Sequence, residues 1–287
     1  MSKVIVIGKG PAGVSCAIYT ARAGIDTTII GNDIGSLSKA EMIENYYGFP
    51  APIPGAELSA NGIAQAERLG AKIISEEVVG LGYDGAAFTV KTQNGEYRAD
   101  SVVIATGSPR KKPKIKGLEE FEGRGVSYCA VCDGFFYRGK SVCVLGSGEY
   151  AVNEAKELLP IAAGVTILTN GEELAGRAPE GVEIVDRLVS ELRGGERLES
   201  ILFKDGSEIK ADGVFVAYGT AGSADLARKL GVFTEGNKII VNEEMETNIP
   251  GLFAAGDCTG GMMQVAKAVY EGARAGMSVI KYLRGGK

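Results

Sequence analysis

Apolar and polar residues follow one order twice along the chain: an apolar strand, a glycine-rich turn, a helical stretch and a second strand. In the first copy the strand, the helical stretch and the second strand cover residues 4–7, 14–23 and 27–30. In the second copy the strands cover residues 141–145 and 165–168, and the helical stretch ends at Leu159. Short β-branched runs that alternate with helical segments indicate βαβ units and a parallel sheet. Two such units in one chain indicate an internal duplication.

Each copy continues to a later strand that closes on a phrase of small residues, and a third such strand lies near the C-terminus. These strands with their closing phrases cover residues 102–107, 214–219 and 252–257. Residues 264–283 have the apolar spacing of one amphipathic helix. Charged, proline-containing stretches at 108–113 and 243–250 are the expected domain boundaries. The sequence therefore predicts a discontinuous first domain, 1–111 with 241–287, and an inserted second domain, 112–240.

The composition is typical of a globular protein from a reducing compartment. The chain is 45% apolar and 23% charged, and its net charge of −5 weighs against nucleic-acid binding. No apolar run reaches the roughly 18 residues that a membrane span needs, and the run 4–7 is too short for a signal peptide. Five cysteines are too few, and odd in number, for a disulfide scaffold. We therefore expect a cytoplasmic protein without a membrane partner.

The chain contains no histidine, which excludes a Ser-His-Asp triad, a Cys-His pair and imidazole metal ligands. Proton transfer near neutral pH must come from a carboxylate, thiol, amine, phenol or bound cofactor. Glycine is frequent, with 42 residues that are not gathered into low-complexity tracts. This excess indicates tight turns and close backbone approaches.

The first glycine-rich turn has the spacing of a dinucleotide-binding fingerprint, Gly8-Lys9-Gly10-Pro11-Ala12-Gly13. Gly8 allows the tight turn, Gly10 lets the backbone reach a pyrophosphate, and Gly13 lets helix and strand pack closely. An incidental glycine-rich turn is the alternative, but the surrounding strand, helix and second strand favour the fingerprint.

The pair Cys129 and Cys132, followed directly by Asp133, is the sharpest chemical signal. The C-x-x-C spacing permits a small-loop disulfide and lowers the pKa of one thiol. The carboxyl group of Asp133 can protonate a departing thiolate, and a helix cap or a surface acid is the alternative. We expect no metal site, because zinc would need two further ligands. The three remaining cysteines, which fit small buried side chains, are Cys16, Cys143 and Cys258.

Six phrases make the chain resemble the low-molecular-weight thioredoxin reductases over essentially its full length. The phrases are Gly8–Gly13, Glu44–Tyr46, Ala105–Gly107, Gly123–Cys129, Cys132–Phe136 and Ala255–Asp257. The resemblance implies an α/β protein of two Rossmann-like, three-layer ββα domains, of the FAD/NAD(P)-binding flavoprotein disulfide reductase type, with the second domain inserted in the first. It also implies FAD on the first domain, the redox pair on the second, a homodimer, and reduction of thioredoxin or a thioredoxin-like protein.

The resemblance also implies roles for individual residues. Cys132 would take electrons from reduced flavin, Cys129 would attack the partner's disulfide, and Asp133 would donate the proton. A helix N-terminus at Gln264–Ala266 would lie near the flavin N1, where reduction builds negative charge. The residues expected to bind FAD are Gly8, Gly10, Pro11, Ala12, Gly13, Gly31, Asn32, Leu37, Asn45, Val78, Ala105, Thr106, Gly107, Gly256, Asp257, Gln264, Val265 and Ala266.

The second glycine-rich turn departs from the NADPH-dependent members of the family. Those members carry a His-Arg-Arg segment and a further Arg, whose cations grip the 2′-phosphate. The corresponding positions here are Thr169, Asn170, Gly171 and Ala175. Glu172 and Glu173 would repel a phosphate, and Glu149 and Tyr150 would stand where a pyrophosphate approaches a helix N-terminus. We therefore expect a degenerate nucleotide site with a trimmed adenosine-flanking segment.

Three further phrases resemble the ferredoxin-dependent flavin thioredoxin reductases, which use no pyridine nucleotide. The phrases are Ser36–Glu41, Tyr218–Ser223 and Gly260–Gly272. We therefore expect reduced ferredoxin as electron donor. Ferredoxins are usually acidic, so the cation-rich stretch Arg110–Lys116 is a candidate dock, with an exposed linker as the alternative. NADH, NADPH or a deazaflavin as donor, a second FAD in the degenerate site, and a non-enzymatic flavin-binding sensor are the competing interpretations.

Overall fold

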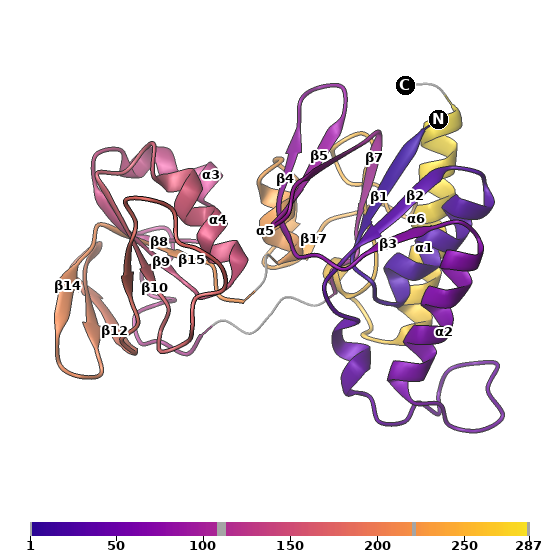
Figure 1. The fold of residues 1–287 in the computed structure, drawn as a ribbon, viewed down its shortest axis with the longest axis horizontal. Coiled ribbons are helices and arrows are strands. Elements are labelled where there is room, and N and C mark those ends of the chain that lie inside the picture. The colour runs from indigo at the N-terminus through magenta and orange to yellow at the C-terminus, as the bar shows by residue number, and fades with distance from the viewer. Residues whose placement is uncertain (1, 108–112, 220–221, 286–287) are drawn as a thin grey trace. The chain divides into compact units, whose positions relative to one another are not determined.

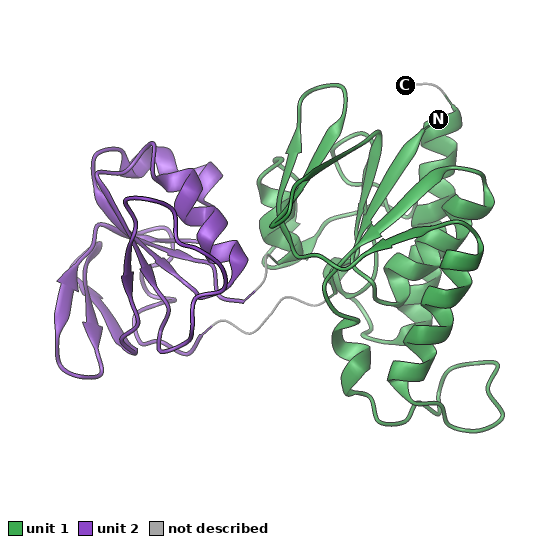
Figure 2. Cartoon of the chain, viewed as in Figure 1, with its two compact units in different colours: residues 1–109, 222–287 green, residues 110–221 purple. Residues whose placement is uncertain are grey.

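The computed structural model describes residues 2–107, 113–219 and 222–285, which form two compact units (Figure 2). Unit 1 comprises Met1–Pro109 and Gly222–Lys287, and unit 2 comprises Arg110–Ala221. Each unit has a hydrophobic core of its own. Unit 2 is therefore a domain inserted between two segments of unit 1.

A five-stranded parallel sheet forms the centre of unit 1, in the order β18-β7-β1-β2-β3. Its strands are β1 (Lys3–Ile7), β2 (Asp26–Ile30), β3 (Lys72–Ile74), β7 (Ser101–Ile104) and β18 (Leu252–Ala254). The layer on one face contains the helices α1 (Pro11–Arg22), α2 (Gly55–Arg68) and α6 (Val265–Arg284) (Figure 1). The layer on the other is an antiparallel sheet of β4 (Val78–Tyr83), β5 (Phe88–Thr92) and β6 (Glu96–Ala99). Because both faces are covered, the apolar run of β1 is buried throughout from Val4 to Ile7.

Helices α1 and α6 pack closely because small residues line their contact. A Cβ atom at Gly272 would lie 2.1 Å from the carbonyl oxygen of Ala12, which leaves no space for a side chain. Ser15 Oγ donates a hydrogen bond of 2.8 Å to the carbonyl oxygen of Val269. Both helices begin after strands of the same parallel sheet, so their N-termini lie at the carboxyl edge of that sheet.

Unit 1 also contains several short elements. They are η1 (Gly35–Lys39), α5 (Ser223–Arg228), β16 (Thr234–Glu235), β17 (Lys238–Ile239) and η3 (Asp257–Thr259). Helix α5 contacts β4 and β17 and buries Leu226. Residues 222–240 therefore belong to unit 1, whereas the sequence placed them in the inserted domain. The charged stretch 243–250 is no linker, because Glu246 within it forms an antiparallel bridge with Phe253.

Unit 2 has a five-stranded parallel sheet in the order β11-β10-β9-β15-β8. Its strands are β8 (Val126–Ser127), β9 (Ser141–Leu145), β10 (Gly164–Leu168), β11 (Glu183–Val185) and β15 (Gly213–Val216). Its helices are α3 (Ala130–Asp133), η2 (Gly134–Tyr137) and α4 (Glu149–Leu158). A second, antiparallel sheet consists of β12 (Val189–Gly194), β13 (Leu198–Phe203) and β14 (Glu208–Lys210). Between β10 and β11 the chain forms no helix, as the short sequence there predicts.

The two units repeat one topology. Strand β1 pairs with β2 and β7, and strand β9 pairs in parallel with β10 and β15 in the same way. Each central strand leads through a glycine-rich turn into a helix, α1 or α4. The internal duplication and the two three-layer Rossmann-like domains expected from the sequence are therefore confirmed. Within the described ranges, no helix has the length and apolarity needed to cross a membrane.

Candidate active site

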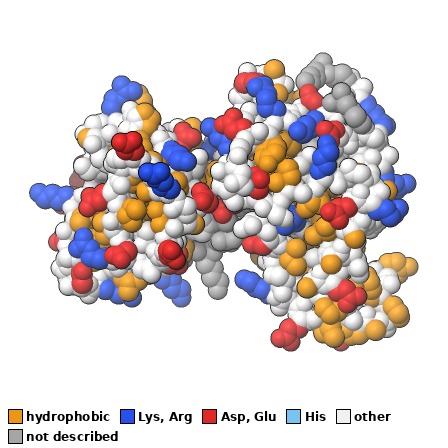
Figure 3. All heavy atoms as spheres, viewed as in Figure 1, with side chains coloured by type: hydrophobic (Ala, Val, Ile, Leu, Met, Phe, Trp, Pro, Cys, Tyr) orange, Lys and Arg blue, Asp and Glu red, His pale blue; other side chains and the backbone are white. Residues whose placement is uncertain are grey.

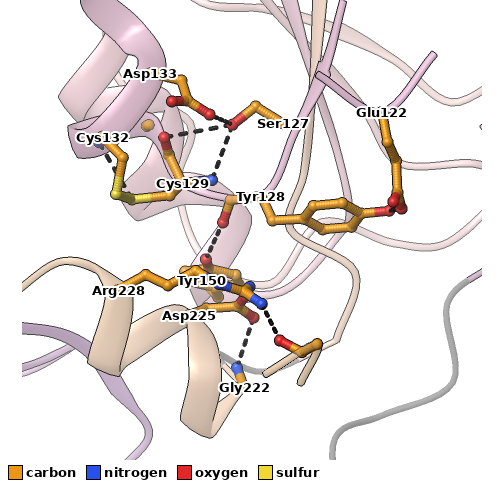
Figure 4. A network of polar contacts seen from close by, with 12 residues as sticks. Glu122, Ser127, Tyr128, Cys129, Cys132, Asp133, Tyr150, Gly222, Asp225 and Arg228 are labelled. Atoms are coloured by element: carbon orange, nitrogen blue, oxygen red, sulfur yellow. Dashed lines mark hydrogen bonds and ion pairs between the residues drawn. A yellow bond between two sulfur atoms is a disulfide. The ribbon is translucent and has the colours of Figure 1, made fainter. Parts of the chain in front are cut away.

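Cys129 and Cys132 form a disulfide at the start of helix α3, with their Cα atoms 5.3 Å apart (Figure 4). Cys129 is the N-cap residue of this helix, and its Sγ accepts a hydrogen bond of 3.2 Å from the Cys132 N–H. Cys129 is 3% exposed, whereas Cys132 lies at the surface. The accessible sulfur of this disulfide is therefore that of Cys132.

Asp133 is held beside the disulfide by Ser127 of strand β8. Ser127 Oγ donates a hydrogen bond of 2.7 Å to Asp133 Oδ2 and accepts one of 3.1 Å from the Cys129 N–H. The same hydroxyl therefore connects the carboxyl group to the first cysteine (Figure 4). Asp133 makes no side-chain capping bond to η2, so the helix-cap interpretation is wrong.

Glu154 is a buried carboxylate next to the disulfide that sequence reasoning missed. It lies on α4, is 1% exposed, and accepts a hydrogen bond of 2.8 Å from the Ala130 N–H with Oε2. This bond satisfies the first N–H after Cys129. The signal was a charged residue on the apolar face of a helix, between the buried residues Tyr150 and Leu158.

The other three cysteines are free thiols in the interior, as the sequence predicted. Burial raises the pKa of Cys16, of Cys143 and of Cys258 to about 12 in each case. These thiols are therefore protonated near neutral pH and take no part in thiol chemistry. Among the residues that the structure covers, no group of three potential metal ligands comes together.

The first glycine-rich turn fits the pyrophosphate of a dinucleotide. A Cβ atom at Gly8, where φ is +118°, would lie 2.3 Å from the carbonyl oxygen of Ala105, and one at Gly13 would lie 2.0 Å from that of Gly8. Gly10, in contrast, has open space beside it and is the N-cap of α1 without a side-chain cap. No side chain caps this helix start, and the helix N-terminus carries the partial positive charge that favours an anion.

The other residues expected to bind FAD gather at the same edge of the sheet. Thr106, after β7, has a buried Oγ1 without a hydrogen-bond partner among the described residues, as expected for a group that a ligand satisfies. Asn45 Nδ2 donates a hydrogen bond of 3.0 Å to Gln264 Oε1, which connects the loop before α2 with the start of α6. Gly256 and Asp257 follow β18, and Gly31 and Asn32 follow β2. The arrangement is that of a dinucleotide at the carboxyl ends of parallel strands.

Two of the expected FAD residues lie in apolar surroundings. Leu37 of η1 belongs to a small hydrophobic cluster with Ile43 and Ile53, against which Val265 packs. Val78 is the buried first residue of β4. Their side chains can line the cofactor only with apolar atoms.

The second glycine-rich turn keeps its backbone but is covered by the segment 169–176, here called the 169–176 loop. A Cβ atom at Gly146 would lie 2.1 Å from the carbonyl oxygen of Ala217, as at the equivalent Gly8. The Ala175 N–H donates a hydrogen bond of 2.7 Å to the carbonyl oxygen of Ser147. Ser147 Oγ also donates to Glu172. A carboxylate and a loop backbone thus occupy the turn that would receive a pyrophosphate.

Further contacts hold the 169–176 loop in place. Tyr218 donates a hydrogen bond of 3.1 Å to Glu172 Oε1. The Val189 N–H donates one of 2.7 Å to Asn170 Oδ1. Burial raises the pKa of Tyr218, so its hydroxyl remains a donor at neutral pH. The loop is therefore fastened at its start by Asn170 and at its middle by Glu172.

Glu149 and Tyr150 differ in their relation to this site. Glu149 is the first residue of α4, and its Oε1 would lie 2.4 Å from a Cβ atom at Gly176 of the loop. Tyr150, expected to obstruct the site, instead points into the interior. It is 1% exposed and its hydroxyl donates to the carbonyl oxygen of Tyr128 at 3.3 Å (Figure 4). The repulsion of an anion therefore comes from Glu149 and Glu172.

The cation-rich stretch Arg110–Lys116 lies partly outside the described residues, at 110–112. Of its described cations, Lys114 is exposed, and Lys116 forms an ion pair with Glu191. Glu191 also pairs with Arg193. The described part therefore presents less free positive charge than the sequence suggested.

Comparison with known proteins places the chain in one family. The family model for pyridine nucleotide-disulphide oxidoreductases matches residues 2–272. The thioredoxin reductase of Aquifex aeolicus is 36% identical over 99% of this chain and 94% of its own length. The crystal structure of an atypical thioredoxin reductase from Desulfovibrio vulgaris Hildenborough is 42% identical, with a TM-score of 0.95 over 99% of both chains.

A crystal structure of a ferredoxin-flavin thioredoxin reductase from Clostridium acetobutylicum is 34% identical, with a TM-score of 0.74 over 100% of both chains. These matches extend over both units and include the disulfide and the first glycine-rich turn. The chain therefore belongs to the pyridine nucleotide-disulphide oxidoreductase family and is, within it, a low-molecular-weight thioredoxin reductase that binds FAD.

Proposed function

We propose that this thioredoxin reductase draws its electrons from reduced ferredoxin rather than from NADPH, and passes them through Cys129 and Cys132 to thioredoxin or a thioredoxin-like protein. The observation that carries the proposal is the 169–176 loop, which lies on the glycine-rich turn of unit 2. A pyridine nucleotide would have to displace the Ala175 hydrogen bond and bring its phosphates to Glu172 and Glu149. This chain lacks, at Thr169, Asn170, Gly171 and Ala175, the cations that would offset the cost of displacing the loop and of bringing phosphates to the two carboxylates.

NADH is the competing donor, because its ribose can use an acid near the end of the strand. Glu172 follows strand β10 and is such an acid. Its carboxylate, however, is already bonded to Ser147 and to Tyr218. The closed loop also opposes the pyrophosphate of NADH as much as that of NADPH. The likeness to the ferredoxin-flavin enzyme of Clostridium acetobutylicum supports ferredoxin instead.

Bound FAD can accept electrons singly and deliver them as a pair. The remaining steps belong to the chain. Two electrons cleave the Cys129–Cys132 bond and leave two thiolates. Cys132 is the cysteine that receives the electrons from the flavin. The Cys129 thiolate then attacks the partner's disulfide, forming a mixed disulfide and releasing one partner sulfur. Cys132 attacks Cys129 Sγ, which releases the second partner sulfur and restores the disulfide. Asp133, held by Ser127, donates a proton to a departing sulfur.

The burial of Cys129 adds a condition to this scheme. Its sulfur is covered in the disulfide form, while Cys132 is exposed. The turn that begins α3 must therefore open before Cys129 can reach a partner. Opening it breaks the bond between the Cys132 N–H and Cys129 Sγ, which the cleavage of the disulfide facilitates.

Residues at the first glycine-rich turn, Gly8 to Gly13, and at the ends of β7 and β18 are proposed to bind FAD. We also propose a cytoplasmic homodimer. Met42, Tyr47 and Phe49 are exposed on unit 1. Apolar side chains also form a patch on the surface of unit 1 (Figure 3). Such a patch favours contact with a second protein surface.

Single-cysteine variants test the route through the disulfide. Cys132→Ser and Cys129→Ser should both keep FAD, and both should leave electrons on the photoreduced flavin when thioredoxin is added anaerobically. With a single-cysteine thioredoxin whose remaining cysteine is activated as its thionitrobenzoate disulfide, Cys132→Ser should release thionitrobenzoate and form a stable mixed disulfide, and Cys129→Ser should not. Mass spectrometry of the adducts and flavin absorbance give the readouts. If Cys132→Ser reduced thioredoxin at the wild-type rate, the proposed route through the disulfide would be wrong. If only Cys129→Ser formed the adduct, Cys132 would be the cysteine that attacks the partner.

A further inference from the structure

Lys267 and Glu271 form a largely buried ion pair at the start of α6. Lys267 Nζ lies 2.9 Å from Glu271 Oε2, and their side chains are only 13% and 12% exposed. Lys267 also donates to the carbonyl oxygen of Gly256 at 2.8 Å, to Thr259 Oγ1 at 3.0 Å and to the carbonyl oxygen of Gly260. Glu271 Oε2 accepts hydrogen bonds from the Gly256 N–H at 2.8 Å and from Thr259 Oγ1 at 3.0 Å. One pair thus binds both ends of the segment 256–260.

The local sequence alone disfavours this pair. Lys267 is in the first turn of α6, where the helix dipole opposes a cation. A lysine four residues before a glutamate is also the weaker orientation of a helical ion pair. Since the helix dipole and the residue order both disfavour this ion pair, we infer that tertiary contacts stabilise it. Here those contacts are the backbone groups of the turn after β18.

The turn that the pair holds is rich in glycine and needs such an anchor. Gly256 and Gly260 have φ values of +90° and +85°, in the left-handed region that other residues rarely adopt. Gly256 also has no space for a side chain, because its Cβ atom would lie 2.8 Å from that of Ala12. Glycine loses more conformational freedom on ordering than any other residue. The position of Asp257 between them therefore depends on what fastens the turn.

We propose that Lys267 and Glu271 are positioning residues for FAD, which fix the Asp257 turn against the first turn of α6. This inference rests on the proposed assignment of Asp257 to FAD. Loss of either charge leaves the other buried without its partner, which costs far more than losing an exposed pair. The turn then shifts or loosens, and the flavin site loses its shape at the end of β18.

Lys267→Met in the full-length holoprotein should release FAD about tenfold faster on dilution than wild type, measured by the return of flavin fluorescence. Lys267→Arg should restore most of the retention, because it keeps the charge and the donors. Arg274→Met is the matched control, since Arg274 on the same helix pairs with Glu244 at the surface. It should release FAD within about twofold of wild type.

Two further variants separate the possible failures. Lys267→Met/Glu271→Met, which buries no charge, should release FAD more slowly than Lys267→Met alone. Asp257→Ala should release FAD faster than wild type if the assignment of Asp257 is right. If Lys267→Met released FAD no faster than Arg274→Met does, the positioning role of Lys267 and Glu271 would be wrong. If Asp257→Ala released FAD at the wild-type rate, the assignment of Asp257 to the FAD site would be wrong. Equal unfolding temperatures of the apoproteins with unequal FAD release would exclude a merely structural role.

Discussion

The Asp133 carboxyl group is positioned by a serine that does not itself take part in disulfide exchange. Ser127 is buried in the two-residue strand β8, and its hydroxyl bonds to both Asp133 and the Cys129 N–H. The hydroxyl thus fixes the Asp133 carboxyl group beside Cys129. Glu154 likewise positions the backbone at Ala130 by accepting a hydrogen bond from its N–H. The disulfide is therefore positioned from two sides, by β8 and by α4.

Ser127→Ala should slow thioredoxin reduction about tenfold, because losing one hydrogen bond to a charged group costs on the order of 1.4 kcal/mol. The flavin spectrum should not change. The measurement is the rate of partner disulfide reduction after photoreduction, over a range of pH. Ser200→Ala is the control, since Ser200 lies in the same unit and its hydroxyl donates to Glu208 of the neighbouring strand β14. If both variants react at the wild-type rate, Asp133 acts without Ser127.

At this scale the sequence predicted the reacting groups but not their neighbours. Cys129, Cys132 and Asp133 lie within five residues of the chain, so their spacing alone indicated a redox pair with a carboxyl group beside it. Ser127 and Glu154 act through contacts that form only when β8 and α4 pack on α3. Tyr150 was predicted on the wrong side of α4, because a helix start at 149 directs the next side chain inward. Periodicity could have found it, since Tyr150 shares the buried face with Glu154 and Leu158.

The 169–176 loop is the element on which the proposal of ferredoxin as electron donor depends. It replaces the cationic segment of NADPH-dependent relatives with a short connection between β10 and β11. Its hydrogen bonds to Ser147 are internal to unit 2. The Glu172 carboxylate accepts hydrogen bonds from Ser147 of the glycine-rich turn and from Tyr218, so a negative charge lies beside the turn that would receive a nucleotide phosphate.

Loosening this loop should expose the glycine-rich turn. Glu172→Ala/Ala175→Pro removes one carboxylate and one N–H donor, and should raise the affinity of the protein for NADH about tenfold over wild type. Isothermal titration under anaerobic conditions measures the affinity. Glu173→Ala, within the same loop, controls for the loss of a negative charge alone. Equal NADH affinity in wild type and the double variant would mean that the loop does not close the site.

The strands of the two parallel sheets that the sequence analysis named were predicted to within a few residues, because buried parallel strands form continuous apolar runs, whereas the antiparallel sheets and α2 were not predicted. The second domain boundary was not. Helix α5 is short, and only its contacts with β4 and β17 assign 222–240 to unit 1. The charged stretch that follows resembled a linker, since charge and proline mark turns within a domain as well as turns between domains.

The whole molecule uses one duplicated fold for two different purposes. Unit 1 keeps an accessible glycine-rich turn and binds FAD. Unit 2 keeps the equivalent backbone at Gly146, but its turn is covered, and the unit serves instead to carry the disulfide. A chain without histidine can do this chemistry if a carboxyl group supplies the proton, as proposed for Asp133. The fold class and the redox pair followed from the sequence, while the closure of the second site required the contacts of the loop.

The electron donor is the central claim, and anaerobic rapid mixing tests it most directly. The oxidised, FAD-loaded protein is mixed with reduced ferredoxin, with NADPH or with NADH, and the flavin absorbance is followed with thioredoxin present. Reduced ferredoxin should bleach the flavin and sustain thioredoxin reduction, whereas either nucleotide at millimolar concentration should leave the flavin oxidised on that timescale. Rapid bleaching by NADPH or NADH, with ferredoxin inactive, would contradict the account.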